Sequence, residues 1–204
     1  ELTKIAWSHD GRYIAAPAIS NLSGPGQGGT VRIWDIEAGK YFDIMRSPQG
    51  VFHSLAFAPD SQRLVISADE NRIVISALNG RDQRPLQRQS VSRVWSVDWS
   101  PDGKQIVVLL RENRRVKHSF VITSDDEGAT WSDPREVAAP LTGDRHVAKY
   151  GVDGRLFVTF RDMLADSPTK GDWVAWVGRY DDIVNGRSGQ YRVRLMDNTD
   201  AWDS

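Results

Sequence analysis

A short pattern recurs four times along this chain and limits the folds that it can adopt. In each copy an aromatic residue stands three positions before an aspartate, and an apolar residue stands five positions before it and four after it. Apolar residues that alternate on both sides of a turn predict two antiparallel β-strands with one buried face. Recurrence every 40 to 50 residues, roughly, predicts one β-unit repeated four times. The four copies are IAWSHDGRYI, LAFAPDSQRL, VDWSPDGKQI and AKYGVDGRLF, which contain Asp10, Asp60, Asp102 and Asp153.

The centre of each copy reads as a hairpin turn. Aspartate is followed by glycine in three copies and by serine in the second. Glycine adopts the positive φ that such turns require, and an aspartate side chain can accept hydrogen bonds from nearby backbone N–H groups. We therefore expect these residues to build the fold. They are Asp10 and Gly11, Asp60, Asp102 and Gly103, and Asp153 and Gly154.

Each unit has room for two further strands after the hairpin. Only the fourth strand of the second unit is weakly patterned, in QRQSVSRV at 87–94. The further strands are expected at 30–36 and 40–45, at 72–78, at 118–123 and 134–139, and at 172–180 and 190–196.

Four-stranded units of this size predict an all-β fold, a β-propeller of about four blades, each of four antiparallel strands. The blades are expected at about 1–46, 50–90, 91–139 and 143–197, in one domain over 1–204. Independent hairpins in a β-sandwich are the alternative. Four blades either close alone or form part of a larger ring, and a homodimer is one way to complete such a ring.

Composition excludes several classes of partner and site. Lys plus Arg number 26 and Asp plus Glu 27, so the formal net charge is −1, which gives no general case for nucleic-acid binding. The chain has no cysteine, which excludes disulfides and thiolate metal sites. No run approaches the roughly 18 apolar residues of a membrane-spanning helix. The four histidines show no metal-ligand spacing, so we expect neither metal nor cofactor.

Residues 1 to about 110 resemble WD-repeat propellers. The stretches that carry the resemblance are AWSHDGRYIA, VRIWDIEAGK, AFAPDSQRLVIS and VDWSPDGKQIVVL. Trp34-Asp35 is the only WD dipeptide in this part of the chain, and the Gly-His pair that often stands near the start of such a blade is missing from it. The resemblance implies blades that present loops to a protein or peptide ligand.

Residues about 116 to 204 are similar to sialidase-family propellers. The stretch TSDDEGATW fits the Asp-box pattern S-x-D-x-G-x-T-W of that family, also called the BNR repeat. The motif lies where the first unit has its outer hairpin, so we expect a turn that stabilises the blade rather than an active site. Its fixed positions are Ser124, Asp126, Gly128, Thr130 and Trp131, while Asp125 and Glu127 are expected to be solvated.

The sialidase resemblance also implies arginines that hold a substrate carboxylate, because guanidinium groups match carboxylates bidentately. Arg145 and Arg161 are the candidates, and ion pairs with Asp144 or Asp162 are the structural alternative. Three aspartates and one histidine could supply acid or base chemistry, but nothing in the sequence separates them from ordinary loop and strand residues. They are Asp162, Asp166, Asp172 and His146.

The Tyr–Glu nucleophile pair that the resemblance also implies is not found in this sequence. The residues therefore favour a catalytically incomplete binding or scaffold module for a protein, peptide or carbohydrate ligand. Alternatively, the chain is part of a glycoside hydrolase that releases terminal sialic acid. A further alternative is a chimera or fragment without evolved activity, because the two resemblances meet inside the third unit.

Overall fold

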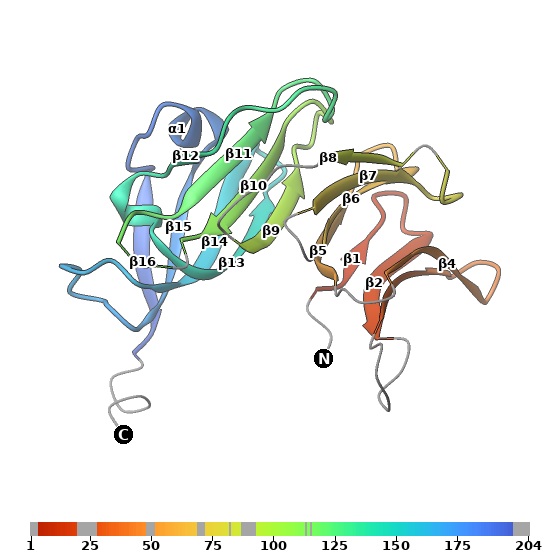
Figure 1. Ribbon diagram of the computed structural model, residues 1–204, viewed down its shortest axis with the longest axis horizontal. Helices are drawn as coiled ribbons and strands as arrows, with labels where there is room; N and C mark the ends of the chain where they lie inside the picture. The colour runs from red at the N-terminus through yellow and green to blue at the C-terminus, as the bar shows by residue number, and fades with distance from the viewer. Residues whose placement is uncertain are drawn as a thin grey trace.

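The computed structural model describes residues 4–19, 28–47, 52–68, 72–81, 83–86, 93–112, 114 and 116–197. These residues form four antiparallel sheets of four strands, and in each sheet the strands follow one another in chain order (Figure 1). The all-β fold of about four blades is therefore confirmed. The sheets do not close into a ring, and they form an arc with blade 1 (red and orange) at one end and blade 4 (cyan to blue) at the other.

The strands of each blade run from the innermost to the outermost in sequence order. Blade 1 contains β1 (Ala6–Trp7), β2 (Tyr13–Ile19), β3 (Gly29–Asp35) and β4 (Lys40–Ser47). Blade 2 contains β5 (Phe52–Phe57), β6 (Arg63–Ala68), β7 (Arg72–Ala77) and β8 (Arg84–Leu86). Blade 3 contains β9 (Arg93–Trp99), β10 (Ile106–Arg111), β11 (Phe120–Ser124) and β12 (Arg135–Glu136). Blade 4 contains β13 (Gly143–Tyr150), β14 (Arg155–Asp162), β15 (Trp173–Arg179) and β16 (Tyr191–Met196).

The outer strands depart most from the sequence expectations. β12 has two residues, and the chain then forms a short 3-10 helix at Ala139–Leu141. β8 ends at Leu86, before the weakly patterned stretch, whose residues 87–92 lie outside the described part of the chain. A five-residue helix, α1 (Tyr180–Val184), follows β15 and was not expected from the sequence. Among the described residues, no helix is long and apolar enough to cross a membrane.

Successive blades pack face to face, and each junction contains one apolar cluster. The first cluster joins Ile33 of blade 1 to Leu64 of blade 2. The second joins Val65 to Val97, and the third joins Leu109 to Phe160. Because full burial of one such side chain contributes about 1.5–3 kcal/mol, the three junctions hold the arc together.

The hairpin of blade 4 differs from the other three by one residue. Gly151 N–H bonds the carbonyl of Arg155, whereas Ser8 N–H reaches one position further, to Tyr13. Tyr150 therefore pairs with Leu156, which is fully buried. The repeat pattern puts Phe157, four residues after Asp153, on the same face as Tyr150, whereas the structure places it on the opposite face, where it is 46% exposed. A slip of one residue moves a strand's side chains to the opposite face of the sheet.

Candidate interaction surface

The four repeated turns share one geometry, in which the aspartate Oδ1 accepts the backbone N–H two residues further on. These bonds measure 3.0 Å at Asp10, 2.8 Å at Asp60, and 3.1 Å at Asp102 and Asp153. The residue after each aspartate has positive φ, which favours glycine and is strained for other residues. These φ values are 77° at Gly11, 59° at Ser61, 76° at Gly103 and 74° at Gly154. Hydrogen bonds from the Ser8 hydroxyl and the Arg12 backbone lower the pKa of Asp10.

The Asp-box residues form one connected set of hydrogen bonds in the hairpin between β11 and β12. The Asp126 carboxylate accepts the backbone N–H and the hydroxyl of Thr130, at 2.8 and 2.6 Å. These two bonds lower the pKa of Asp126. Ser124 Oγ accepts the Gly128 N–H at 2.9 Å, and Trp131 Nε1 donates to the Gly128 carbonyl at 3.0 Å. Among the described residues, the side chains of Ser124, Asp126, Thr130 and Trp131 form hydrogen bonds only within this hairpin.

The same hairpin also contacts blade 2. A Cβ added to Gly128, whose φ is 78°, would lie 2.0 Å from Ile75 Cδ1. Glu127, which was expected to be solvated, accepts a hydrogen bond from Arg63 at 2.8 Å, although half of its side chain is exposed. The hairpin therefore lies against the junction of blades 2 and 3.

The two candidate arginines have different environments. Arg161 donates from Nη2 to Asp144 Oδ2 at 3.0 Å, and only 18% of its side chain is exposed. Arg145 has a φ of 58°, lies in the register shift between β13 and β14, and is exposed. Among the described residues, Arg145 makes no ion pair. Arg161 therefore forms a structural ion pair with Asp144, which the sequence analysis named as the alternative to binding a substrate carboxylate.

Most of the candidate acids and bases hold structural partners. Asp162 is fully buried and accepts bonds from Ser167, Thr169 and Arg192 at 2.5, 2.7 and 2.6 Å. Burial raises the pKa of Asp162, but these bonds outweigh it and lower the pKa below its ordinary value. Asp172 pairs with Arg194 at 3.3 Å.

Two further candidates complete this group. Asp166 is exposed in the loop that follows β14. His146 is buried with Nε2 3.1 Å from the Leu141 carbonyl, and burial lowers its pKa to about 4. In the described parts of the chain, no three His, Asp or Glu side chains are placed to hold a metal ion.

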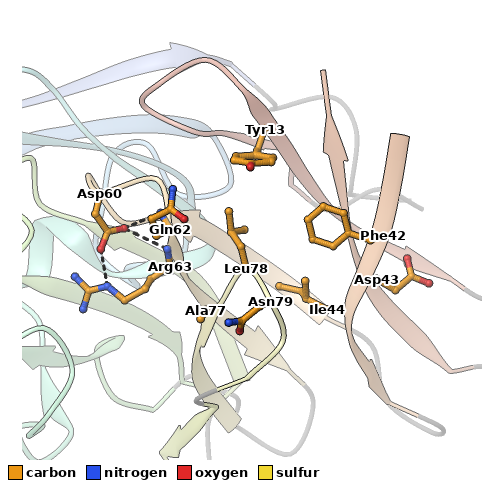
Figure 2. Close-up of a pocket in the computed structure, with 10 residues that line it drawn as sticks. All are labelled: Tyr13, Phe42, Asp43, Ile44, Asp60, Gln62, Arg63, Ala77, Leu78 and Asn79. Atoms are coloured by element: carbon orange, nitrogen blue, oxygen red, sulfur yellow. Dashed lines mark hydrogen bonds and ion pairs between the residues drawn. The ribbon is translucent and has the colours of Figure 1, made fainter. Parts of the chain in front are cut away.

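An open groove of about 710 Å³ lies between blades 1 and 2 (Figure 2). Its apolar lining comes from Tyr13, Phe42 and Ile44 of blade 1 and from Leu78 of blade 2. Of the candidates taken from the sequence, only Asp60 lies in its wall. The groove was missed because its walls come from segments that are remote in sequence and carry no motif.

Two strand-to-turn contacts position the groove. Phe42 pairs with Ile33 across β3 and β4, so its ring lies on the face of blade 1 that turns toward blade 2. The turn after β7 lies against β4, because a Cβ on Gly80 would be 3.0 Å from the Ile44 carbonyl. Gln83 Nε2 donates to the same carbonyl at 3.3 Å. These contacts leave Phe42 37% exposed while Leu78 and Ile44 are buried.

The charged residues of the groove are already paired. Asp43 accepts bonds from Arg32 and Arg46 at 2.8 and 3.1 Å, and the Arg32 bond chiefly lowers the pKa of Asp43. Asp60 accepts a bond from Arg63 Nε at 2.6 Å. The groove therefore offers an apolar lining with neutralised charges at its edge, which suits an apolar side chain flanked by polar backbone.

Comparison with known proteins supports the repeat assignment. The family model described as WD domain, G-beta repeat matches residues 1–35 and 83–126. A curated relative, the periodic tryptophan protein 2 homolog of Neurospora crassa, is 26% identical over 153 residues. This match covers 74% of the chain but only 16% of the relative.

Three solved structures share the fold at low sequence identity. TolB from Acinetobacter baumannii superposes with a TM-score of 0.64 at 16% identity, over 97% of this chain and 44% of that one. The β-propeller domain of Myceliophteria thermophila Cps50 (Swd1) superposes with a TM-score of 0.62 at 12% identity, over 96% of this chain and 56% of that one. An oligogalacturonate lyase in complex with manganese superposes with a TM-score of 0.65 at 12% identity, over 98% of this chain and 54% of that one.

The chain spans about half the length of these structures. The resemblance of residues 116–204 to sialidases stays a prediction. The chain is therefore an arc of β-propeller blades whose residues 1–35 and 83–126 match the WD-domain model.

Proposed function

We propose that this chain is a protein-binding platform and that the groove between blades 1 and 2 holds a peptide segment of the partner. The observation that carries the proposal is the side chain of Phe42, which is 37% exposed and lines the groove together with the buried apolar side chains of Leu78 and Ile44. The WD repeats support the same class of function, since proteins with such repeats generally mediate protein interactions.

The groove's shape and chemistry suggest the kind of segment that it accepts. Binding pockets of about 300–1,000 Å³ with apolar walls and a few polar groups take one or two buried side chains rather than a broad flat surface. The paired carboxylates of Asp43 and Asp60 leave little net charge to attract an ionic ligand. We therefore expect a peptide with one or two large apolar residues and no requirement for charge.

Selection from a displayed random peptide library tests this proposal. Peptides enriched on the wild-type chain should bind Phe42→Ala at least 10-fold more weakly, because loss of a buried aromatic contact removes about 1.5–3 kcal/mol. Val152→Ala is the matched control, since Val152 is fully exposed on the blade 4 turn, away from the groove. Enriched peptides that bind Phe42→Ala as tightly as the wild type contradict the groove as the site.

A sialidase-family glycosidase, with a carbohydrate ligand, is the second candidate. The connected hydrogen bonds of Asp126 and the exposed, positive-φ position of Arg145 favour it. Hydrolysis of a fluorogenic sialoside by the purified chain, lost in Arg145→Ala and in Arg161→Ala, supports this candidate. Arg145→Ala is the cleaner variant, because Arg161 also holds Asp144. If a longer polypeptide that supplies a Tyr–Glu pair does not hydrolyse the sialoside, the glycosidase candidate is contradicted.

The third candidate is that the chain is a chimera or fragment without evolved activity. The change from WD-like to sialidase-like sequence inside blade 3 motivates it. Longer homologues that carry the same join would argue against it.

A further inference from the structure

Two aromatic side chains on β-strands line the groove between blades 1 and 2. They are Tyr13 of β2 and Phe42 of β4, and neither is fully buried (Figure 2). The guanidinium of Arg12 lies over the Tyr13 ring, 5.0 Å from its centroid, and donates to Asp35 at 2.8 Å. One ring is thus held by a neighbouring ion pair, so a ligand meets a partly preorganised aromatic surface, which lowers the entropy lost on binding.

The carboxylates beside these rings already accept hydrogen bonds on every oxygen. The two oxygens of Asp43 accept bonds from Arg32, at 2.8 and 3.3 Å. Asp60 Oδ1 accepts the backbone N–H of Gln62 at 2.8 Å, and its Oδ2 accepts a bond from Arg63 Nε at 2.6 Å. The strongest acceptors of the groove are therefore occupied, and they leave little for the N–H groups of a ligand.

Three other polar side chains of the groove can each donate a hydrogen bond to a ligand. Asn79 Oδ1 accepts the backbone N–H of Arg81 at 2.8 Å, so its Nδ2 group is the part left for a ligand. Asn79 and Gln62 are both exposed. Among the described residues, no hydrogen bond engages Asn79 Nδ2, the Gln62 carboxamide or the Tyr13 hydroxyl. These groups suit the carbonyl oxygens of a peptide backbone.

We propose that the segment bound in this groove is proline-rich and adopts the polyproline II conformation, an inference that rests on the groove being the peptide site proposed above. Proline has no N–H, and a polyproline II segment makes no internal hydrogen bonds, so it offers carbonyl acceptors and few donors. That complement matches a groove whose acceptors are occupied and whose remaining groups donate. Aromatic-lined grooves are also the sites at which proline-rich segments dock in several peptide-binding domains.

Two other kinds of occupant match the groove less well. A segment in the β conformation without prolines brings one N–H group per residue, and N–H groups that lose water without gaining an acceptor weaken binding. A cationic side chain needs an unpaired carboxylate, whereas Asp43 and Asp60 are paired with arginines. The proline-rich segment avoids both costs, and one or two apolar residues between its prolines can contact Phe42 and Leu78.

Displayed random peptides selected on the wild-type chain test the proposal. Peptides whose binding depends on Phe42 should contain proline well above its frequency in the library. The same peptides, synthesised with blocked ends, should bind about 10-fold more weakly when alanine replaces their prolines, because the free peptide then loses its preformed conformation and gains N–H groups.

Asn79→Asp tests the donor separately from the shape of the groove. The substitution keeps an oxygen for the Arg81 N–H and removes the Nδ2 group, so uncharged proline-containing peptides should bind about 5-fold more weakly, as for one lost hydrogen bond. Gln190→Glu makes the same kind of change at an exposed residue of blade 4 and should leave binding unchanged. Circular dichroism should show that both variants fold, because both residues are exposed.

The outcomes separate this proposal from the proposed function. Phe42-dependent peptides without an excess of proline, or an unchanged affinity in Asn79→Asp, overturn the polyproline II assignment and leave the groove as a peptide site. If no selected peptide depends on Phe42, the groove is not the site and both proposals are wrong.

Discussion

Arg63 of blade 2 donates from Nη1 to Glu127 Oε2 of blade 3 at 2.8 Å. The same guanidinium donates from Nε to Asp60 at 2.6 Å and lies over the Trp99 ring, 5.3 Å from its centroid. Burial lowers the pKa of Arg63, but the bonds to Glu127 and Asp60 outweigh it and raise the pKa. One side chain therefore connects a repeated aspartate turn with the Asp-box hairpin of the next blade.

Substitution of Glu127 should lower the free energy of unfolding less than substitution of Arg63 does. Glu127→Ala removes one exposed ion pair and should lower the free energy of unfolding by less than about 1 kcal/mol. Arg63→Ala also removes the contact with Trp99 and should cost about 1–2 kcal/mol. Urea unfolding of both single variants and the double variant measures the coupling, expected at about 0.5 kcal/mol. Equal costs for the two single variants contradict this division.

Asp126→Ala should destabilise the Asp-box hairpin without affecting ligand binding. The substitution removes the acceptor of two Thr130 bonds and of the Ser124 hydroxyl. We expect the melting temperature to fall by about 2–4 °C, as for a lost local cap in a chain of this size. Asp166→Ala, an exposed loop carboxylate, should leave the melting temperature unchanged. Lost peptide binding at unchanged melting temperature would point to a binding role for Asp126 instead.

Asp162→Ala should be the most damaging single change in blade 4. It leaves Arg192 without its buried partner and releases Ser167 and Thr169 in the loop that follows β14. Removal of one partner of a buried ion pair typically costs about 3–5 kcal/mol. Urea unfolding measures the loss, and Asp166→Ala is again the control. A cost below about 1 kcal/mol for Asp162→Ala contradicts a structural role for this network.

The buried His146 should make the chain less stable in mild acid. Its folded pKa of about 4 lies below the ordinary value of 6.5, so the unfolded chain binds a proton first as the pH falls. The free energy of unfolding should therefore decrease between about pH 6.5 and pH 4, by about 3 kcal/mol from this residue.

His146→Phe removes this titration and keeps a ring beside Phe160, on which His146 stacks at 5.0 Å. At pH 8 the variant should be less stable than the wild type, because the Leu141 carbonyl loses its hydrogen-bond partner. On acidification, its free energy of unfolding should fall less than that of the wild type, as measured by urea unfolding at several pH values. Parallel pH curves for the two proteins would show that His146 does not titrate as described.

The sequence predicted the repeat unit well because its signals are local. Aspartate and glycine at each turn, and apolar alternation on either side, specify a hairpin over about ten residues. The one-residue slip at Gly151 was missed, although the turn residues Asp153 and Gly154 look like the others. Loop length, rather than turn composition, decides which of Leu156 and Phe157 faces the core.

The candidate site was far less accessible to sequence reasoning. Arg145 and Arg161 were predicted together as ligands of a substrate carboxylate. In the structure Arg161 binds Asp144, whereas Arg145 is exposed. The groove brings together residues 13, 42–44, 60, 62–63 and 77–79. No periodicity relates these segments, so the groove arises only when blades 1 and 2 stack.

The sequence by itself determined the β-hairpins, the four blades and the type of turn that joins their inner strands, because backbone preference and apolar period act over a few residues. The tertiary structure decided which carboxylates are paired and where the groove lies. Ion pairs and grooves depend on contacts between blades, and apolar burial drives those contacts without regard to distance along the chain.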